Sequence, residues 1–151
     1  QASVAHEVKW GREAKVGAIL KFIDANLTSS LLEPDRVAAQ FGLSRASLYR
    51  LFDPLGGVAG YIRERRLQRA MEELTARGSP SRSIAAVGRK MGYPDAASFA
   101  RAFRAQFGMT PSAIIKTRAK PTSALPAVIP QPRKTTSTLA DLLQDLSSRQ
   151  R

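Results

Sequence analysis

Residues 34–51 constrain the fold of this chain more than any other stretch, because their small and apolar side chains follow the spacing of a helix-turn-helix. Ala38 is small where a second helix would cross close above the first, and Gly42 can take the positive φ of a tight turn between helices. Four apolar side chains are spaced to hold the two helices together: Val37, Phe41, Leu48 and Leu51. An ordinary helical hairpin needs similar spacing, so this stretch alone leaves both structures open.

Residues 84–103 repeat the pattern. Gly92 lies 50 positions after Gly42, and Val87 lies 50 positions after Val37. Beyond the turn the offset is 51, the distance from Phe52 to Phe103. The second turn therefore contains one additional residue. Because an internal repeat of helical units rarely arises by chance, the repetition favours two helix-turn-helix units over two unrelated hairpins.

Helical periodicity extends through almost all of the first 118 residues and no strand is evident, which predicts an all-α fold. The expected segments are a disordered amino-terminal extension over 1–11, a first helix-turn-helix subdomain over 12–59, a linker helix over 60–78, a second helix-turn-helix subdomain over 79–118, a linker rich in proline, serine and threonine over 119–138, and a short amphipathic helix over 139–151. The last segment is too short to be stable as an isolated helix. A disordered tail and a helix packed on the body or on another subunit both stay open.

Capping residues mark the predicted helix boundaries. Ser44 and Asp95 are placed to cap the second helix of each unit, and Ser83 is placed to cap the helix before the second turn. Three glycines and a proline predict a tight loop over residues 53–60. We expect the long helix that follows to cover residues 61–77.

The charge of the chain is strongly positive and unevenly distributed. Its formal net charge is +12 and its pI is about 11.1. Residues 34–118 hold 15 Lys/Arg against 6 Asp/Glu, a net charge of +9, whereas residues 1–33 hold 4 of each and are neutral. Such a surface predicts a polyanionic partner, nucleic acid ahead of a membrane surface. A basic surface that only aids solubility is the alternative.

Enzymatic chemistry finds little support in the sequence. Cysteine is absent, His6 is the lone histidine, and no Gly-rich phosphate loop follows a strand. We therefore expect no enzyme activity, no metal site and no cofactor. No apolar run approaches transmembrane length and no signal-peptide pattern opens the chain, so we expect a cytoplasmic, nucleoid-associated protein without a membrane partner. Because the sequence begins with Gln1 rather than methionine, we expect the natural protein to extend further at its amino end.

The second unit carries the most specific motifs. They are Met91-Gly92-Tyr93, Ser98-Phe99, Phe103-Arg104, Phe107-Gly108 and Thr110-Pro111-Ser112. In this order they resemble the signature of the DNA-binding domain of the AraC/XylS family of bacterial transcription regulators, and the resemblance covers residues 12–116. It implies two recognition helices that enter adjacent major-groove segments of double-stranded promoter DNA, about 34 Å apart. The loop at 53–60 is shorter than is usual in this family, and the tail after residue 119 lies outside its pattern.

The resemblance also implies partners. Family members commonly add an amino-terminal domain for effector binding or dimerisation, which residues 1–151 do not encode. RNA polymerase is a further candidate partner. A non-specific architectural protein that binds RNA or DNA, and a protein-interaction module built on the same scaffold, are the competing functions.

Helix geometry and the resemblance together assign candidate DNA contacts. The base-contact candidates are Arg45, Ala46, Tyr49, Arg50, Ala96, Ala97 and Arg101. The backbone-contact candidates are Ser44, Ser47, Arg36, Arg82, Ser98, Arg104, Arg89 and Lys90. Arginine is favoured for base reading because its guanidinium can donate two hydrogen bonds to guanine. Arg45 fits phosphate nearly as well, and Tyr49 fits partial burial against the long helix as well as DNA contact.

The second recognition helix has fewer polar groups for DNA. Alanine occupies three of the six positions that remain for DNA in this helix, so we predict that the second unit discriminates bases less sharply than the first. The arginines at 63–69 of the linker helix are expected to stay in solvent or to pair with Glu64, Glu72 and Glu73.

Overall fold

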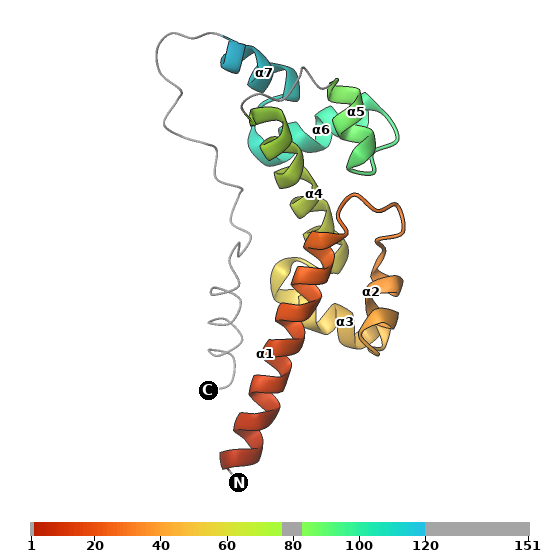
Figure 1. Ribbon diagram of the computed structural model, residues 1–151, viewed down its shortest axis with the longest axis vertical. Helices are drawn as coiled ribbons and strands as arrows, with labels where there is room; N and C mark the ends of the chain where they lie inside the picture. Colours follow the sequence, from red (N-terminus) through yellow and green to blue (C-terminus); the bar gives the residue numbers. More distant parts are fainter. Residues whose placement is uncertain (1, 77–82, 120–151) are drawn as a thin grey trace. The chain divides into compact units, whose positions relative to one another are not determined.

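The computed structural model describes residues 2–76 and 83–119, and every regular element in these two ranges is a helix (Figure 1). In chain order these are α1 (Ala2–Ala25), α2 (Pro34–Gln40), α3 (Arg45–Phe52), the 3₁₀ helix η1 (Asp53–Leu55), α4 (Val58–Thr75), α5 (Ile84–Lys90), α6 (Ala96–Phe107) and α7 (Pro111–Ala119). The predicted all-α fold is confirmed.

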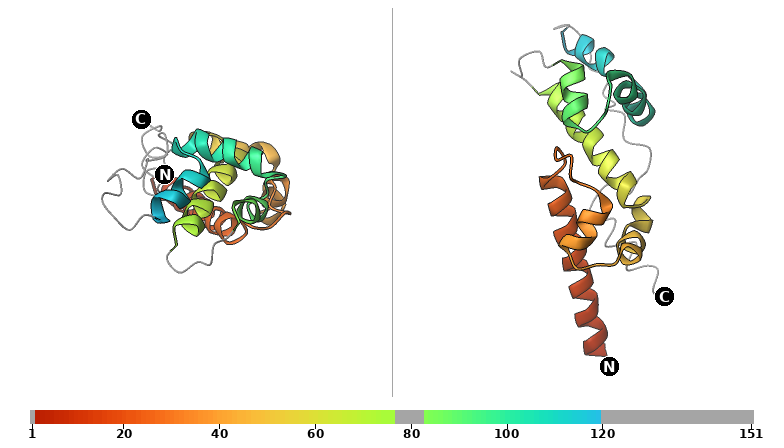
Figure 2. Two further views of the ribbon diagram at one scale, coloured as in Figure 1. Left: turned by 90° about the horizontal axis from the view of Figure 1, so that it is seen from above. Right: turned by 90° about the vertical axis from the view of Figure 1, so that its right-hand side faces the viewer.

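The chain divides into two compact units, and the division falls within α4, between Ile62 and Arg63. The first unit contains α1, α2, α3 and η1, and the second contains α5, α6 and α7. Each unit has its own cluster of buried apolar side chains. The helices of each unit can be followed by colour in Figure 2.

Aliphatic side chains dominate the core of the first unit. Ile19 and Ile23 of α1 are fully buried together with Val37 of α2 and Leu48 of α3. Ile19 and Ile23 are four positions apart and lie on one face of α1, as the apolar periodicity predicted. Phe52, at the end of α3, is also fully buried.

The core of the second unit is built around a row of aromatic rings. Tyr93 and Phe99 have ring centroids 5.4 Å apart, Phe99 and Phe103 5.6 Å, and Phe103 and Phe107 4.7 Å. The three phenylalanines lie on one face of α6 and are buried against Leu67 and other apolar residues of α4 and α5. The first core is therefore mainly aliphatic, with Phe52 as its one buried phenylalanine, whereas the second core is organised around a row of aromatic rings.

The turn between the two helices has the same geometry in both units. Gly42 and Gly92 have φ values of 60° and 83°, in the region that favours glycine. The N–H group after each glycine, that of Leu43 or Tyr93, donates to a carbonyl five residues earlier, at 2.9 Å and 3.0 Å. This bond is the signature of a Schellman motif, which ends the first helix and starts the turn. The predicted pair of matching turns is confirmed.

One matched pair of positions shows how each unit fits its own neighbour. Ala38 of α2 corresponds to Gly88 of α5, and Leu48 of α3 corresponds to Phe99 of α6. A Cβ atom added to Gly88 would lie 3.0 Å from Cγ of Phe99. The smaller residue on α5 therefore makes room for the larger residue on α6.

Several predicted boundaries need correction. Residues 2–11, which we expected to be disordered, form the first turns of α1. They contain no proline, and extending an existing helix is much easier than starting one. The long helix covers Val58–Thr75 instead of beginning at residue 60 or 61 and ending at 77 or 78. Its first residue, Val58, is fully buried in the first core, and the expected loop contains η1. Ser83 is at the N-cap of α5, but its side chain makes no capping hydrogen bond.

The linker expected over 119–138 lies outside the described residues except for Ala119, the last residue of α7. The amphipathic helix expected over 139–151 lies outside them entirely.

Candidate nucleic-acid interface

One face of α3 is exposed and carries the predicted base-contact residues of the first unit. Arg45, Ala46, Tyr49 and Arg50 are all exposed, whereas the opposite face of the helix is buried. The relative solvent exposure of Tyr49 is 39%. Part of the side chain is therefore covered, and part of it is accessible for contact with DNA.

Two side chains hold the guanidinium of Arg45. Nη1 of Arg45 lies 3.5 Å from Oδ1 of Asp35 in the first turn of α2, and the guanidinium lies 5.6 Å from the ring centroid of Tyr49. The hydrogen bond with Tyr49 and the negative charge of Asp35 both raise the pKa of Arg45, so the group stays charged. Both members of the ion pair are well exposed, and such pairs are weak, so DNA phosphate can compete with Asp35. Asp35 was not among the predicted site residues, although it is the carboxylate nearest in sequence before α3.

The first turn of α3 begins with the predicted cap. The N–H group of Ser47 donates to Oγ of Ser44 at 3.1 Å, which confirms Ser44 as an N-cap. The two serine hydroxyls are also hydrogen-bonded, at 2.8 Å. Nη2 of Arg50 donates to the same Oγ of Ser47 at 3.4 Å. Ser47 therefore lies between the cap and a predicted base-contact residue.

The exposed face of α6 is poorer in hydrogen-bonding groups. Ala96, Ala97, Arg101 and Arg104 are exposed, and Ser98 is half-buried. Two of these side chains can only make apolar contacts, so hydrogen bonding to bases depends mainly on the arginines.

Asp95 caps α6 with a carboxylate. The N–H group of Ser98 donates to its Oδ1 at 2.7 Å, and the hydroxyl of Ser98 donates to its Oδ2 at 2.9 Å. Nη2 of Arg101 in turn donates to Oγ of Ser98 at 3.2 Å. The two bonds from Ser98, and to a smaller extent the charge of Arg101, lower the pKa of Asp95, so this cap is ionised at neutral pH. The predicted cap is confirmed.

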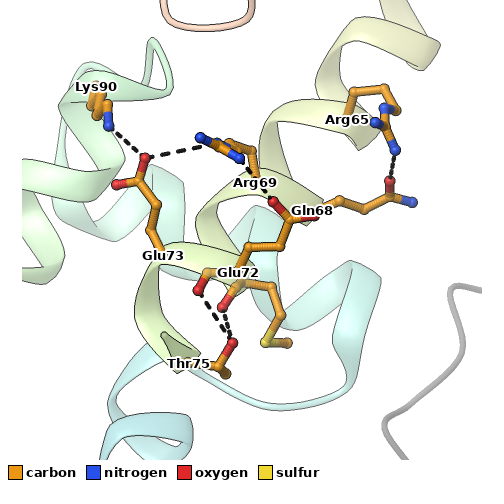
Figure 3. Close-up of polar contacts among 8 residues, drawn as sticks. Arg65, Gln68, Arg69, Glu72, Glu73, Thr75 and Lys90 are labelled. Carbon is orange, nitrogen blue, oxygen red and sulfur yellow. Dashed lines mark hydrogen bonds and ion pairs between the residues drawn. The ribbon is translucent and has the colours of Figure 1, made fainter. Parts of the chain in front are cut away.

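The predicted backbone-contact residues outside α3 and α6 divide into three cases. Arg36 and Arg89 are exposed. Lys90 is exposed too, but its Nζ forms an ion pair with Oε1 of Glu73 on α4 at 2.5 Å (Figure 3). A phosphate would have to compete with this carboxylate. Arg82 lies outside the described residues.

Glu73 joins α5 to a network on α4. Its carboxylate also forms an ion pair with Nε of Arg69, at 4.0 Å, and Nη1 of Arg69 lies 3.2 Å from Oε2 of Glu72 (Figure 3). Nη1 of Arg65 donates to Gln68 at 2.6 Å. These contacts confirm the expectation of pairing for Arg69. The pairing of Lys90 was not predicted, because the two partners are 17 residues apart and no local pattern connects them.

The described residues offer hydrogen-bond donors and positive charge at their exposed helix faces. In residues 2–76 and 83–119, no group of three or more His, Cys, Asp or Glu side chains is arranged to hold a metal ion. Within the same ranges, no helix is both long enough and apolar enough to cross a membrane.

Comparison with known sequences links these residues to gene regulators. A family model described as a helix-turn-helix domain matches residues 37–117. The Msm operon regulatory protein of Streptococcus mutans serotype c is 32% identical over 102 residues, which are 66% of this chain and 35% of that protein. The chain thus spans about a third of the length of this relative.

Two solved structures share the arrangement of helices. A transcriptional regulator from Chromobacterium violaceum, described among AraC-type DNA-binding domain-containing proteins, is similar with a TM-score of 0.65 and 32% identity, over 74% of this chain and 98% of that one. A DNA-binding transcriptional dual regulator from Escherichia coli K-12 is similar with a TM-score of 0.59 and 24% identity, over 72% and 92% of the two chains. The second similarity, at this low identity, shows the fold alone.

Proposed function

Because this chain belongs to the AraC-type helix-turn-helix family, we propose that it binds specific sequences in promoter DNA and thereby regulates transcription. The observation that carries the proposal is the division of α3 and α6 into a buried apolar face and an exposed face that presents arginine. In each unit the exposed face would enter the major groove, where base edges are distinguishable. The two helices would read adjacent groove segments.

In the first unit, α3 would supply most of the base reading. Arg50 would donate two hydrogen bonds to a guanine, and Ala46 would contact the methyl group of a thymine. Arg45 would exchange Asp35 for a base edge or a phosphate, while Tyr49 would stack or hydrogen-bond beside it.

In the second unit, α6 would depend on Arg101 for hydrogen bonds to a base. Ala96 and Ala97 would make apolar contacts, and Arg104 would bind phosphate. An alanine methyl group can contact a thymine methyl, but it cannot form the two hydrogen bonds by which an arginine recognises guanine. The proposal therefore includes stronger base discrimination by the first unit.

Phosphate contacts would provide affinity that does not depend on sequence. The candidates with a described position are Ser44, Ser47, Ser98, Arg36, Arg89, Lys90 and Arg104, and Arg82 is a candidate outside the described residues. Serine hydroxyls carry no charge, so only the Lys and Arg side chains set the salt dependence; six phosphates neutralised by such side chains would give a log–log salt slope of about −5, at about 0.9 per phosphate. Because Lys90 must first leave Glu73, we expect it to contribute less than Arg89.

Selection of preferred duplexes from random DNA, at a stated salt concentration, tests the proposal. We expect one asymmetric site with two different halves, because two unlike units lie in one chain. Equal affinity for all duplexes would instead indicate an architectural DNA- or RNA-binding protein. Absence of nucleic-acid binding at low salt would favour a protein-interaction module.

Substitution of the matched arginines tests the assignment within the selected site. We expect Arg50→Ala to cost about 1–3 kcal/mol of discrimination at one base pair, and Arg101→Ala to cost less. Arg89→Ala is the control, because losing a phosphate contact should weaken binding to all duplexes and reduce the salt slope by about 0.9. Equal or reversed effects of the first two substitutions would contradict the assignment.

In a longer natural protein, a further domain would regulate the binding of DNA by these residues. The Msm operon regulatory protein is nearly three times as long as its matched part, which supports a further domain for effector binding or dimerisation. We include RNA polymerase as a proposed partner at the promoter.

A further inference from the structure

The two recognition helices repeat a chain of three polar residues at the same positions. In α3, the cap Ser44 is bonded to Ser47, which accepts a hydrogen bond from Arg50. The corresponding chain in α6 is displaced by 51 positions, and its members are Asp95, Ser98 and Arg101. The sequence repeat therefore extends to polar contacts on the exposed side of each helix.

The spacing of the chain suits an α-helix. Residues three positions apart are neighbours on the helix surface, so each member can contact the next. A serine hydroxyl can donate one hydrogen bond and accept others, which lets it bond to the cap and to the arginine together. The backbone N–H of the serine is itself bonded to the cap, so the hydroxyl starts from a fixed position.

We propose that Ser47 and Ser98 are positioning residues that orient the guanidinium groups of Arg50 and Arg101 for base contact, instead of binding phosphate themselves. This inference rests on the proposed function, because it deepens the role of the same helix faces. A long arginine side chain loses conformational freedom when it binds a base, and a partner that holds it beforehand reduces that loss. Ser47 accepts from the hydroxyl of Ser44 and Ser98 donates to Asp95, so each serine oxygen has the cap as one partner and an arginine as the other.

The two chains differ in their anchors. The cap of α3 is a neutral hydroxyl, whereas the cap of α6 is the carboxylate of Asp95. The contact from arginine to serine is also shorter in α6, 3.2 Å against 3.4 Å in α3. In α6 the hydroxyl of Ser98 donates to a charged carboxylate, whereas in α3 the neutral hydroxyl of Ser44 donates to Ser47, and a hydrogen bond to a charged group is the stronger of the two. We therefore expect Ser98 to hold its arginine more firmly than Ser47 does.

The test uses Ser47→Ala and Ser98→Ala, which remove a hydroxyl but keep the backbone bond to the cap. In the free protein, nitrogen relaxation of the arginine Nε groups should show a more mobile Arg50 in the first variant and a more mobile Arg101 in the second. Ser47→Thr and Ser98→Thr, which restore the hydroxyl, should restore the wild-type relaxation. Thermal unfolding of each variant controls for loss of structure.

Binding to the selected duplex provides the second measurement. Ser47→Ala should reduce discrimination at the base pair read by Arg50 by roughly threefold to tenfold, the worth of one hydrogen bond. In the Arg50→Ala background it should have no further effect, because the group that it orients is gone. An equal loss of affinity for every duplex, with or without Arg50, would show direct phosphate contact and overturn the proposal.

The two measurements separate this inference from the proposed function. Unchanged mobility of both arginines in the free variants would overturn the positioning role alone, whatever the protein binds. Selection without any preferred duplex would overturn the proposed function and the base-contact part of this inference together. Greater mobility combined with lost discrimination would support both.

Discussion

The helices α3 and α6 occupy equivalent places in their units but expose different chemistry. The exposed face of α3 carries Arg45, Tyr49 and Arg50, whereas the amino-terminal part of α6 exposes alanines before Arg101. Their turns are nevertheless alike, and each helix has a side-chain N-cap at the equivalent position. The comparison teaches that a duplicated scaffold can keep its folding residues while its exposed residues diverge, because the two sets lie on opposite faces.

The buried faces have diverged as well, but in a coupled way. Leu48 beside Ala38 in the first unit is replaced by Phe99 beside Gly88 in the second. The interior tolerates a larger ring only where the facing residue becomes smaller, because protein cores are close-packed. The exposed faces are under no such constraint.

The largest expected effect is the unfolding of the second unit while the first unit stays folded. Phe103 is fully buried between Phe99 and Phe107, so Phe103→Ala should destabilise its unit by about 3–5 kcal/mol. That loss is comparable to the whole stability of a small domain. Hydrogen exchange, measured by mass spectrometry on the full chain, should show reduced protection in α5 and α6 and unchanged protection in α2 and α3.

The matched control is Phe52→Ala, because Phe52 is also fully buried and corresponds to Phe103. It should reduce hydrogen-exchange protection in α2 and α3 and leave the protection of α5 and α6 unchanged. If either substitution reduced protection equally in both units, their cores would not be energetically separate, and the comparison between two units would lose its basis.

A smaller effect would sharpen the comparison between the two cores. In Gly88→Ala the added methyl group would lie 3.0–3.1 Å from three atoms of Phe99, whose ring is held by its aromatic neighbours. An overpacking cost of about 1–3 kcal/mol should exceed the gain in helix propensity of about 1 kcal/mol. The melting temperature should therefore fall. Ala38→Gly should also lower it, and a rise for Gly88→Ala would show that the Phe99 ring can move aside.

The smallest expected effect is a difference in pH dependence between the N-caps of α3 and α6. The folded-state pKa of Asp95 is lowered from its ordinary value of 3.8, so its cap stabilises α6 above that pH and is lost as the pH falls through the lowered value. The hydroxyl of Ser44 does not titrate in this range. In an NMR titration toward acid pH, the amide signal of Ser98 should move while that of Ser47 stays in place. A shared midpoint for both signals would point to general acid unfolding instead.

Much of the fold could be predicted because its signals are local. The turn glycines Gly42 and Gly92 and the caps Ser44 and Asp95 act within a few residues along the chain, so spacing alone identifies them. The exposed position of Arg50 follows equally from helical periodicity, since the buried residues of α3 define its opposite face.

The site was less predictable where partners are distant in sequence. Spacing placed Lys90 among residues free for phosphate, but it is paired with Glu73. Asp35 was not among the predicted site residues, and its contact with Arg45 was missed. Long charged side chains reach several ångströms from the backbone, so their partners depend on how helices are placed and not on the order of residues.

By itself, the sequence determined an all-helical chain with two helix-turn-helix units, their turns, their caps and the faces that are buried. These features depend on backbone conformation and on periods of three to four residues, which the order of residues specifies directly. Only the tertiary structure decided that Gly88 makes room for Phe99 and that Glu73 holds Lys90. Both contacts arise where two helices meet in space, so the order of residues along one helix does not specify them.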